Sequence, residues 1–216
     1  MYSRTHHLKS ENNVIGIHAK QNAKRLRPRR AVKMMLEWSG FNMVYSRPNE
    51  ETLFGVPIIG WAKTMLGDIE GMVPWRNEVK LCRDIDFGRG RFEGYIQPNV
   101  GELRQRAPEA VESYLITPAN PLSVVPNEIP DLTETYALFV DERDQVCLTP
   151  IDQWILTPNG ILSARTRTST APEGLITHED RHFCYYVGKR VADKIRAGDA
   201  RSLNAIARIA FAERNA

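Results

Sequence analysis

The chain has 216 residues, of which 42% are apolar, so it can bury a hydrophobic core as one large domain or two small ones. No run of 18 apolar residues occurs, and the first residues lack the apolar stretch of a signal peptide, which argues against a membrane-spanning helix and against secretion. The cysteines Cys82, Cys147 and Cys184 are far apart and form no C-x-x-C pair, which argues against a disulfide framework and a zinc clamp. These features predict a cytoplasmic protein with no membrane contact and no cofactor.

Positive charge is concentrated at the start of the chain. The net charge of the whole chain is +3, but residues 1–39 hold nine Lys or Arg against two Glu, a net charge of +7, which leaves −4 for the other 177 residues. Residues 1–27 also lack a sustained apolar period, so they are predicted to form a largely flexible basic arm, followed by a single domain over residues 28–216. A basic arm on a mildly acidic body is typical of a protein that meets an acidic partner such as nucleic acid.

Two helices are predicted early in the domain. The first runs from Pro28 to Gly40, because Pro suits a first helical turn, Gly suits a helix end, and four apolar residues recur at i, i+3, i+4 and i+7. These four are Ala31, Met34, Met35 and Trp38. The second helix follows Pro57, where apolar residues recur near helical spacing as far as Ile69.

The middle of the chain is predicted to change from strands to an irregular segment. Residues 79–85 and 92–96 are expected to be strands on either side of the turn-forming sequence GRG, and residues 108–115 a short helix. Residues 117–131 contain four prolines, which disfavour a helix or a central strand. This proline-rich segment is either a linker between two half-chains or an extended strap across one domain.

The last third of the chain is predicted to form hairpins followed by helices. Runs of β-forming residues flank polar turns within residues 135–168, which indicates two β-hairpins. Thr177 suits a helix N-cap, so a helix is predicted over residues 178–197, with a second helix beyond it. The predicted fold class is therefore α+β: an antiparallel sheet with hairpins around 79–96 and 135–168, flanking helices, and a C-terminal helical hairpin.

One short motif suggests metal chemistry. Residues 178–182 match H-E-x-x-H, in which His178 and His182 on one helical face would bind zinc and Glu179 would activate a bound water. The two middle residues are charged and no third ligand is evident, whereas an N-terminal helix cap explains the same residues. A strand would place His178, His182, Asp180 and Cys184 on one face, but the cap signal favours a helix.

Two segments have the composition of a nucleic-acid contact. Residues 24–33 are rich in Lys and Arg, which can neutralise phosphates and release counterions. Residues 86–95, if extended, place Phe87 and Tyr95 on one face with two arginines, but Glu93 adds a negative charge to that face. A bulged hairpin explains the three glycines of the segment at least as well. The predicted nucleic-acid-binding residues are Lys24, Arg25, Arg27, Arg29, Arg30, Lys33, Arg89 and Arg91.

Three functions remain open from the sequence. The favoured one is a non-enzymatic nucleic-acid-binding accessory subunit of a larger cytoplasmic assembly, acting through its basic arm and first helix. A structural or adaptor protein that binds other protein subunits is the alternative, because four tryptophans and an irregular proline-rich segment suit packing in a complex. A zinc-dependent hydrolase is less favoured. Arg201 and Arg208 could face DNA from a helix-turn-helix, but a plain helical hairpin fits the same pattern.

Overall fold

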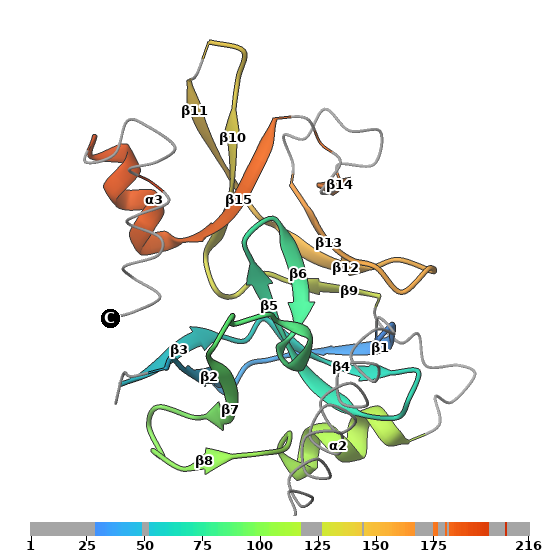
Figure 1. Cartoon of the computed structure of the whole chain (residues 1–216). Coiled ribbons are helices and arrows are strands. Elements are labelled where there is room, and N and C mark those ends of the chain that lie inside the picture. Colours follow the sequence, from blue (N-terminus) through green and yellow to red (C-terminus); the bar gives the residue numbers. More distant parts are fainter. Residues whose placement is uncertain are drawn as a thin grey trace, which may run out of the picture.

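A computed structural model describes residues 29–48, 52–117, 127–143, 145–166, 175–176, 180, 182–198 and 206. Over these residues the protein is mostly β, with four small antiparallel sheets arranged as a four-bladed β-propeller and only two short helices (Figure 1). We call each sheet a blade and name it after one of its strands.

The strands of each blade follow one another in an order that differs from the chain order. The β1 blade runs β1 (Ala31–Leu36), β4 (Gly60–Thr64), β5 (Ile69–Trp75), β6 (Glu78–Leu81). The β2 blade runs β3 (Leu53–Pro57), β2 (Asn42–Ser46), β7 (Arg91–Ile96), β8 (Leu103–Arg104). The β12 blade runs β14 (Leu175–Ile176), β13 (Leu162–Arg165), β12 (Gln153–Leu156), β9 (Glu128–Pro130). The β10 blade runs β11 (Val146–Pro150), β10 (Thr135–Val140), β15 (Phe183–Gly188). The helical segments are η1 (Cys82–Asp84), α2 (Glu109–Ile116) and α3 (Lys189–Arg196).

The β1 blade is buried on both of its faces. Met34 lies in one apolar cluster together with residues of the β12 and β10 blades, whereas the next residue, Met35, lies in a second cluster with the β2 blade and α2. On the neighbouring strand β4, Ala62 and Trp61 divide between the same two clusters, and each is fully buried. Successive side chains of a strand point to opposite faces, so one sheet can serve two cores.

This two-sided burial overturns the predicted α+β class at its first element. Residues 31–36 form strand β1, not a helix. Adjacent apolar residues at 34 and 35 pack on opposite faces, and a bulge between Ala31 and Lys33 shifts the register, so that the apolar spacing imitates a helical period. Trp38, which was expected on the buried face of that helix, is 64% exposed.

The next two predictions fail for related reasons. The helix predicted after Pro57 is replaced by β4, a turn and the start of β5, and Gly67 in the turn has a positive φ of 88° that suits no helix. The expected hairpin over residues 79–96 is also absent from the described residues. β6 pairs with β5, whereas β7 pairs with β2 and β8, so these two strands belong to different blades.

At the C-terminal end a strand takes the place of most of the predicted helix. Residues 183–188 form β15, which pairs with β10, and the helix α3 begins only at Lys189. The sequence FCYYV is rich in aromatic and β-branched residues, whose strand preference prevails over the upstream N-cap signal. Of the second predicted helix, the structure describes Ile206 alone, which is helical and fully buried.

Other elements form where they were predicted, although in different sheets. Helix α2 occupies residues 109–116, and the hairpins β10–β11 and β12–β13 form within residues 135–168. The two hairpins lie in separate blades and not in one meander. Of the proline-rich segment, residues 118–126 lie outside the described residues, and residues 128–130 form the edge strand β9, a position that tolerates Pro130.

We expect Gly60→Ala to destabilise the fold by about 1–3 kcal/mol, the usual cost of overpacking a core. A Cβ at Gly60 would lie 2.7 Å from the Met35 carbonyl oxygen and equally close to side chains of Met72 and Ile129. Urea unfolding of the variant measures the loss. Gly55→Ala is the control, because its added Cβ would meet no atom closer than 3.8 Å; equal stability of the two variants would contradict the packing described for Gly60.

Candidate functional site

Four aromatic rings from four segments of the chain contact one another at the ends of β2, β3 and β5 and in the loop before β7. The ring of Tyr45 stacks on that of Phe87 with centroids 4.8 Å apart, and it contacts the edge of Trp75 at 5.8 Å and Phe54 at 5.4 Å. Trp75 and Phe87 also meet at 5.4 Å. Tyr45 and Phe54 are buried, whereas Trp75 and Phe87 keep part of their surface in solvent.

One arginine contacts these rings, and three more lie within two residues of them in the chain or on the paired strand β7. The Arg47 guanidinium lies 4.6 Å from the centre of the Phe54 ring, an arrangement that favours a cation over a π face. Arg76 directly follows Trp75, and Arg89 lies in the turn after Phe87; both are exposed. The side chain of Arg91 is 79% exposed. We call these four rings and four arginines the arginine–aromatic surface; its members are Tyr45, Phe54, Trp75, Phe87, Arg47, Arg76, Arg89 and Arg91.

Glycines hold the loop before β7 close to strand β2. A Cβ at Gly90 would lie only 2.2 Å from the Ser46 carbonyl oxygen, so no other residue fits there without moving the loop. The amide of Gly88, whose φ is +67°, donates to the Asp86 carboxylate at 2.8 Å. This packing fixes Phe87 against Tyr45, and it accounts for the glycine-rich composition of the segment.

Two acidic residues accompany the arginine–aromatic surface in the described part of the chain. Glu93 accepts hydrogen bonds from Arg91 at 2.6 Å and from the Ser46 hydroxyl at 2.5 Å, and these bonds lower the pKa of its carboxyl. Asp86 caps the loop. The four arginines therefore exceed the acidic side chains of the same segments by two charges. Tyr95, predicted to share this face, is instead fully buried, and its hydroxyl accepts a hydrogen bond from the Gly71 amide.

Arg76 adopts a backbone conformation that usually favours glycine or asparagine. Its φ is +58° in the turn between β5 and β6, and its carbonyl oxygen accepts a hydrogen bond from the Tyr186 amide at 2.7 Å. A left-handed non-glycine residue costs roughly 1 kcal/mol or more. The turn would form more easily with Asn at this position, so the fold itself gives no reason for an arginine side chain here.

Most of the predicted basic cluster does not form an interface. Lys24, Arg25 and Arg27 lie outside the described residues. Lys33 donates to the carbonyl oxygens of Tyr114 and Thr117, and it lies on strand β1, not on a helix. Arg30 is exposed and lies beside Gly160 in the turn between β12 and β13.

Arg29 belongs to a buried charge cluster. Its guanidinium lies 2.6 Å from Glu70, whose side chain is only 2% exposed, and 3.6 Å from Asp84. The Arg83 amide also donates to Glu70, at 3.3 Å. Burial raises the pKa of Glu70 to about 7, although Arg83 and Arg29 lower it. Arg29 therefore anchors the start of the described chain to β5, and it is not available to an external anion.

The zinc alternative gains no support from its described residues. His178 and Glu179 lie outside the described residues, and His182 directly precedes strand β15, so the predicted helix does not form at this residue. The Nδ1 atom of His182 lies 3.1 Å from the Val140 carbonyl oxygen. Among the described residues no group of three or more His, Cys, Asp or Glu side chains is placed to hold a metal ion, and no helix is long and apolar enough to cross a membrane.

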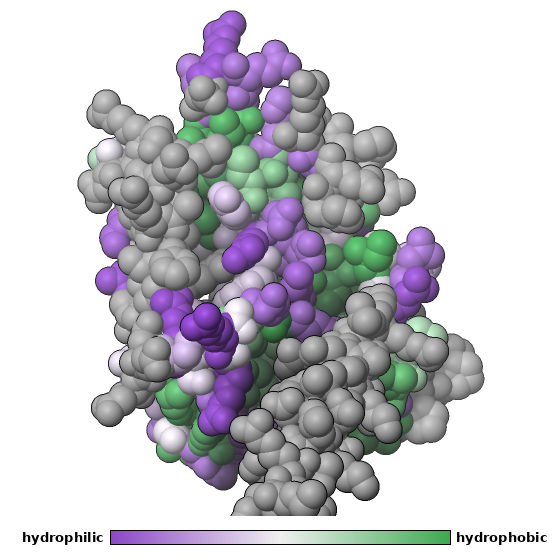
Figure 2. All heavy atoms as spheres, in the orientation of Figure 1, coloured by the Kyte–Doolittle hydropathy of each residue, from purple (hydrophilic) through white to green (hydrophobic). Residues whose placement is uncertain are grey.

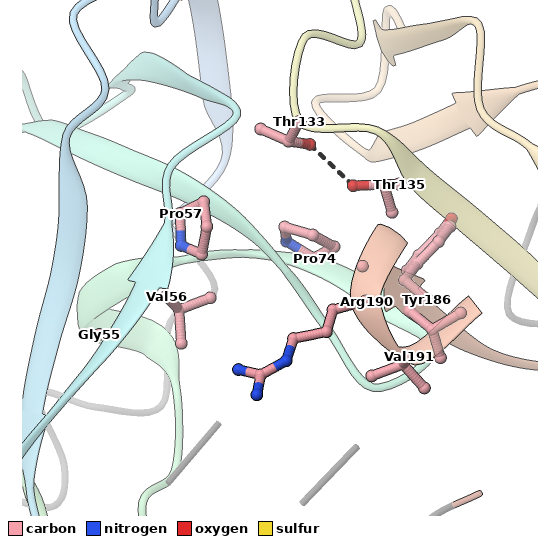
Figure 3. Close-up of a pocket in the computed structure, with 11 residues that line it drawn as sticks. Gly55, Val56, Pro57, Pro74, Thr133, Thr135, Tyr186, Arg190 and Val191 are labelled. Carbon is pink, nitrogen blue, oxygen red and sulfur yellow. Dashed lines mark hydrogen bonds between the residues drawn. The ribbon is translucent and has the colours of Figure 1, made fainter. Parts of the chain in front are cut away.

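A cavity of about 250 Å³ lies between strands of two blades and the start of α3 (Figure 3). Its walls come from β3, the end of β5, the segment before β10, β15 and the start of α3. Gly55 and Pro74, which line it, are the chain neighbours of Phe54 and Trp75. The rings and the cavity therefore draw residues from the same two strands, β3 and β5.

No family model matches the chain, and no curated protein or solved structure is significantly similar to it. A function therefore has to be inferred from the geometry of the chain itself.

Sequence reasoning found part of the arginine–aromatic surface and missed the rest. Phe87, Arg89 and Arg91 lie within one short segment, where spacing alone could suggest a shared face. Arg47, Trp75 and Arg76 come from distant segments, and their sequence neighbourhoods carry no signal that they meet Phe87. Only the pairing of β2 with β7 and the contact of Trp75 with Tyr45 bring them together.

We expect the free energy of unfolding to fall as the pH rises from about 4.5 to about 7, because the folded state holds a proton on Glu70 that the unfolded chain releases at its ordinary pKa. Glu70→Gln keeps the shape and cannot ionise, so it should remove this contribution. The difference should be on the order of 2–3 kcal/mol, measured by urea unfolding at both pH values. An identical pH dependence of the two proteins would show that Glu70 does not titrate in this range.

Proposed function

We propose that the protein is a non-enzymatic module that binds single-stranded nucleic acid on the arginine–aromatic surface. The observation that carries this proposal is the cluster of four contacting rings, two of them partly exposed, with Arg47 over one ring and three exposed arginines in the neighbouring turns and strand. Partly exposed rings can stack on unpaired bases, and arginines can contact the phosphates between them. This combination suits a single strand better than a duplex, whose bases are already stacked.

The conformation of Arg76 supports the proposal independently of the rings. Its left-handed backbone disfavours an arginine, whose side chain is nevertheless exposed beside Trp75. Use of the guanidinium by a ligand gives this residue a role that the fold does not. Strained positions of this kind concentrate at functional sites.

The basic arm adds affinity in this proposal but does not define the site. Residues 1–28 hold six of the nine Lys or Arg residues of segment 1–39, and Lys24, Arg25 and Arg27 are the three closest in sequence to the domain. Such residues contribute sequence-independent, salt-sensitive attraction to phosphates. The rings give preference for unpaired bases, and the arm gives none.

A second candidate function, binding a protein partner, rests on a different place in the fold. Trp38 is 64% exposed and lines a cavity of about 210 Å³ together with Gln97 and Arg104. An exposed tryptophan beside a groove is the usual anchor of a protein interface. The two functions are separable, because a protein complex should survive nuclease and high salt, whereas a complex held together by nucleic acid should not.

We expect Arg76→Asn combined with Arg89→Gln to weaken binding of single-stranded oligonucleotides while leaving the melting temperature unchanged or raised. Asn relieves the left-handed strain at position 76, and residue 89 is exposed in its turn. Each lost phosphate contact should reduce the slope of log affinity against log salt by about 0.7. Fluorescence anisotropy with labelled DNA and RNA, single-stranded and double-stranded, measures the affinity across salt concentrations.

The control is Arg143→Gln combined with Arg165→Gln, which removes the same charge from two other blades. Arg143 lies in the turn of the β10–β11 hairpin, whose hydrophilic tip stands out at the top of Figure 2. Arg165 lies on β13 and pairs with Glu128. If both double variants lose the same affinity for single-stranded oligonucleotides, only net charge matters and the arginine–aromatic surface is not the site. If the natural protein binds no nucleic acid, the proposed function is wrong.

A further inference from the structure

The cavity beside the arginine–aromatic surface has apolar walls and a polar end. Val56, Pro57, Pro74 and Val191 supply apolar surface, while Thr133 and Thr135 supply hydroxyl groups. Its volume of about 250 Å³ lies below the roughly 300–1,000 Å³ of sites for drug-sized ligands, so it suits one small group.

The hydrogen bonds of the two threonine hydroxyl groups determine which of them can accept a further hydrogen bond. Thr133 donates to the Asp131 carboxylate at 2.6 Å, and the Thr133 and Thr135 oxygens lie 2.7 Å apart. Because each hydroxyl has one proton, Thr135 must donate to Thr133. The oxygen of Thr135, a cavity-lining residue only 4% exposed, is therefore the donor in this bond and can accept a hydrogen bond from an N–H group of a base.

The opposite side of the cavity is positively charged. Arg190 lines the cavity, and in Figure 3 its side chain extends from α3 toward β3. The first turn of α3 holds no acidic side chain, and the N-cap residue Gly188 provides no side-chain hydrogen bond to the helix amides. A guanidinium next to the positive end of a helix favours a phosphate or another anion.

The cavity is also lined by chain neighbours of the arginine–aromatic surface. Phe54 and Gly55 are consecutive on β3, and Pro74, Trp75 and Arg76 are consecutive at the end of β5. The Arg76 carbonyl oxygen binds the amide of Tyr186, another residue that lines the cavity. The end of β5 thus links the ring cluster to the wall of the cavity.

We propose that this cavity is a nucleotide pocket, in which one base of the bound strand lies between the apolar walls and its phosphate contacts Arg190. This inference rests on the proposed function and adds a site that reads a single nucleotide to a surface that stacks bases in general. The occupant follows from three features: apolar walls for a flat base, an acceptor on Thr135, and the Arg190 cation that extends toward β3.

Isothermal titration calorimetry with AMP, CMP, GMP and UMP tests the pocket without the rest of a strand. We expect at least one of the four to bind, and its nucleoside and inorganic phosphate to bind at least about tenfold more weakly, because each supplies only half of the contacts. Arg190→Gln should weaken the nucleotide about tenfold, the effect of losing one charge-assisted hydrogen bond.

Gly188→Leu tests the cavity itself. A Cβ on Gly188 meets no atom within 4 Å, so a larger side chain should enter open space without disturbing the fold, and it should prevent nucleotide binding. Lys189→Gln is the charge-matched control, because Lys189 is exposed and pairs with Glu134 at 2.7 Å, outside the cavity lining. Melting temperatures of all three variants confirm that they fold.

The results separate this inference from the proposed function. In one outcome, single strands bind through Trp75 and Arg76, no mononucleotide binds, and neither Arg190→Gln nor Gly188→Leu changes the affinity for a strand. The pocket is then refuted and the proposed function stands. If a mononucleotide binds and both variants abolish it while oligonucleotides do not bind, the pocket stands and the proposed function falls. If neither ligand binds, both are refuted.

Discussion

The structure depends on one sheet that is buried on both faces. In the β1 blade, Met34, Ala62 and Met72 pack toward the β12 and β10 blades, and each is fully buried. Met35 and Trp61 pack toward the β2 blade and α2. Removal of either core would expose one face of the β1 blade, and the blades that pack on it would lose their common support.

This arrangement also determines where the arginine–aromatic surface lies. β5 belongs to the doubly buried β1 blade, and its last residue, Trp75, reaches Tyr45 at the end of β2 in the neighbouring blade. The pairing of β2 with β7 brings Phe87 and Arg91 to the same end. Residues from two blades therefore meet at one edge. The cavity is lined by residues of β3 and β5, two of the strands that carry these rings, together with β15 and α3 (Figure 3).

The same two-sided burial explains why sequence patterns identified the C-terminal hairpins but not the fold class. In β10–β11 and β12–β13, local turn chemistry at Asp141 and Gly160 fixes the pairing of neighbouring strands, so the sequence contains the signal. In β1, apolar residues on both faces remove the alternation that marks a strand. The candidate site was predictable only in part for a similar reason. Phe87, Arg89 and Arg91 are close in sequence, whereas contacts between distant strands bring in Arg47, Trp75 and Arg76.

Photochemical crosslinking of the full chain to single-stranded oligonucleotides that carry 5-bromouracil, followed by mass spectrometry of the linked peptides, tests the central claim most directly. Bases that stack on the arginine–aromatic surface should crosslink to Trp75 and Phe87, the two partly exposed rings. That result would place the bases on the edge shared by the two blades. Crosslinks confined to residues 1–28, or none from an oligonucleotide that is demonstrably bound, would contradict the account.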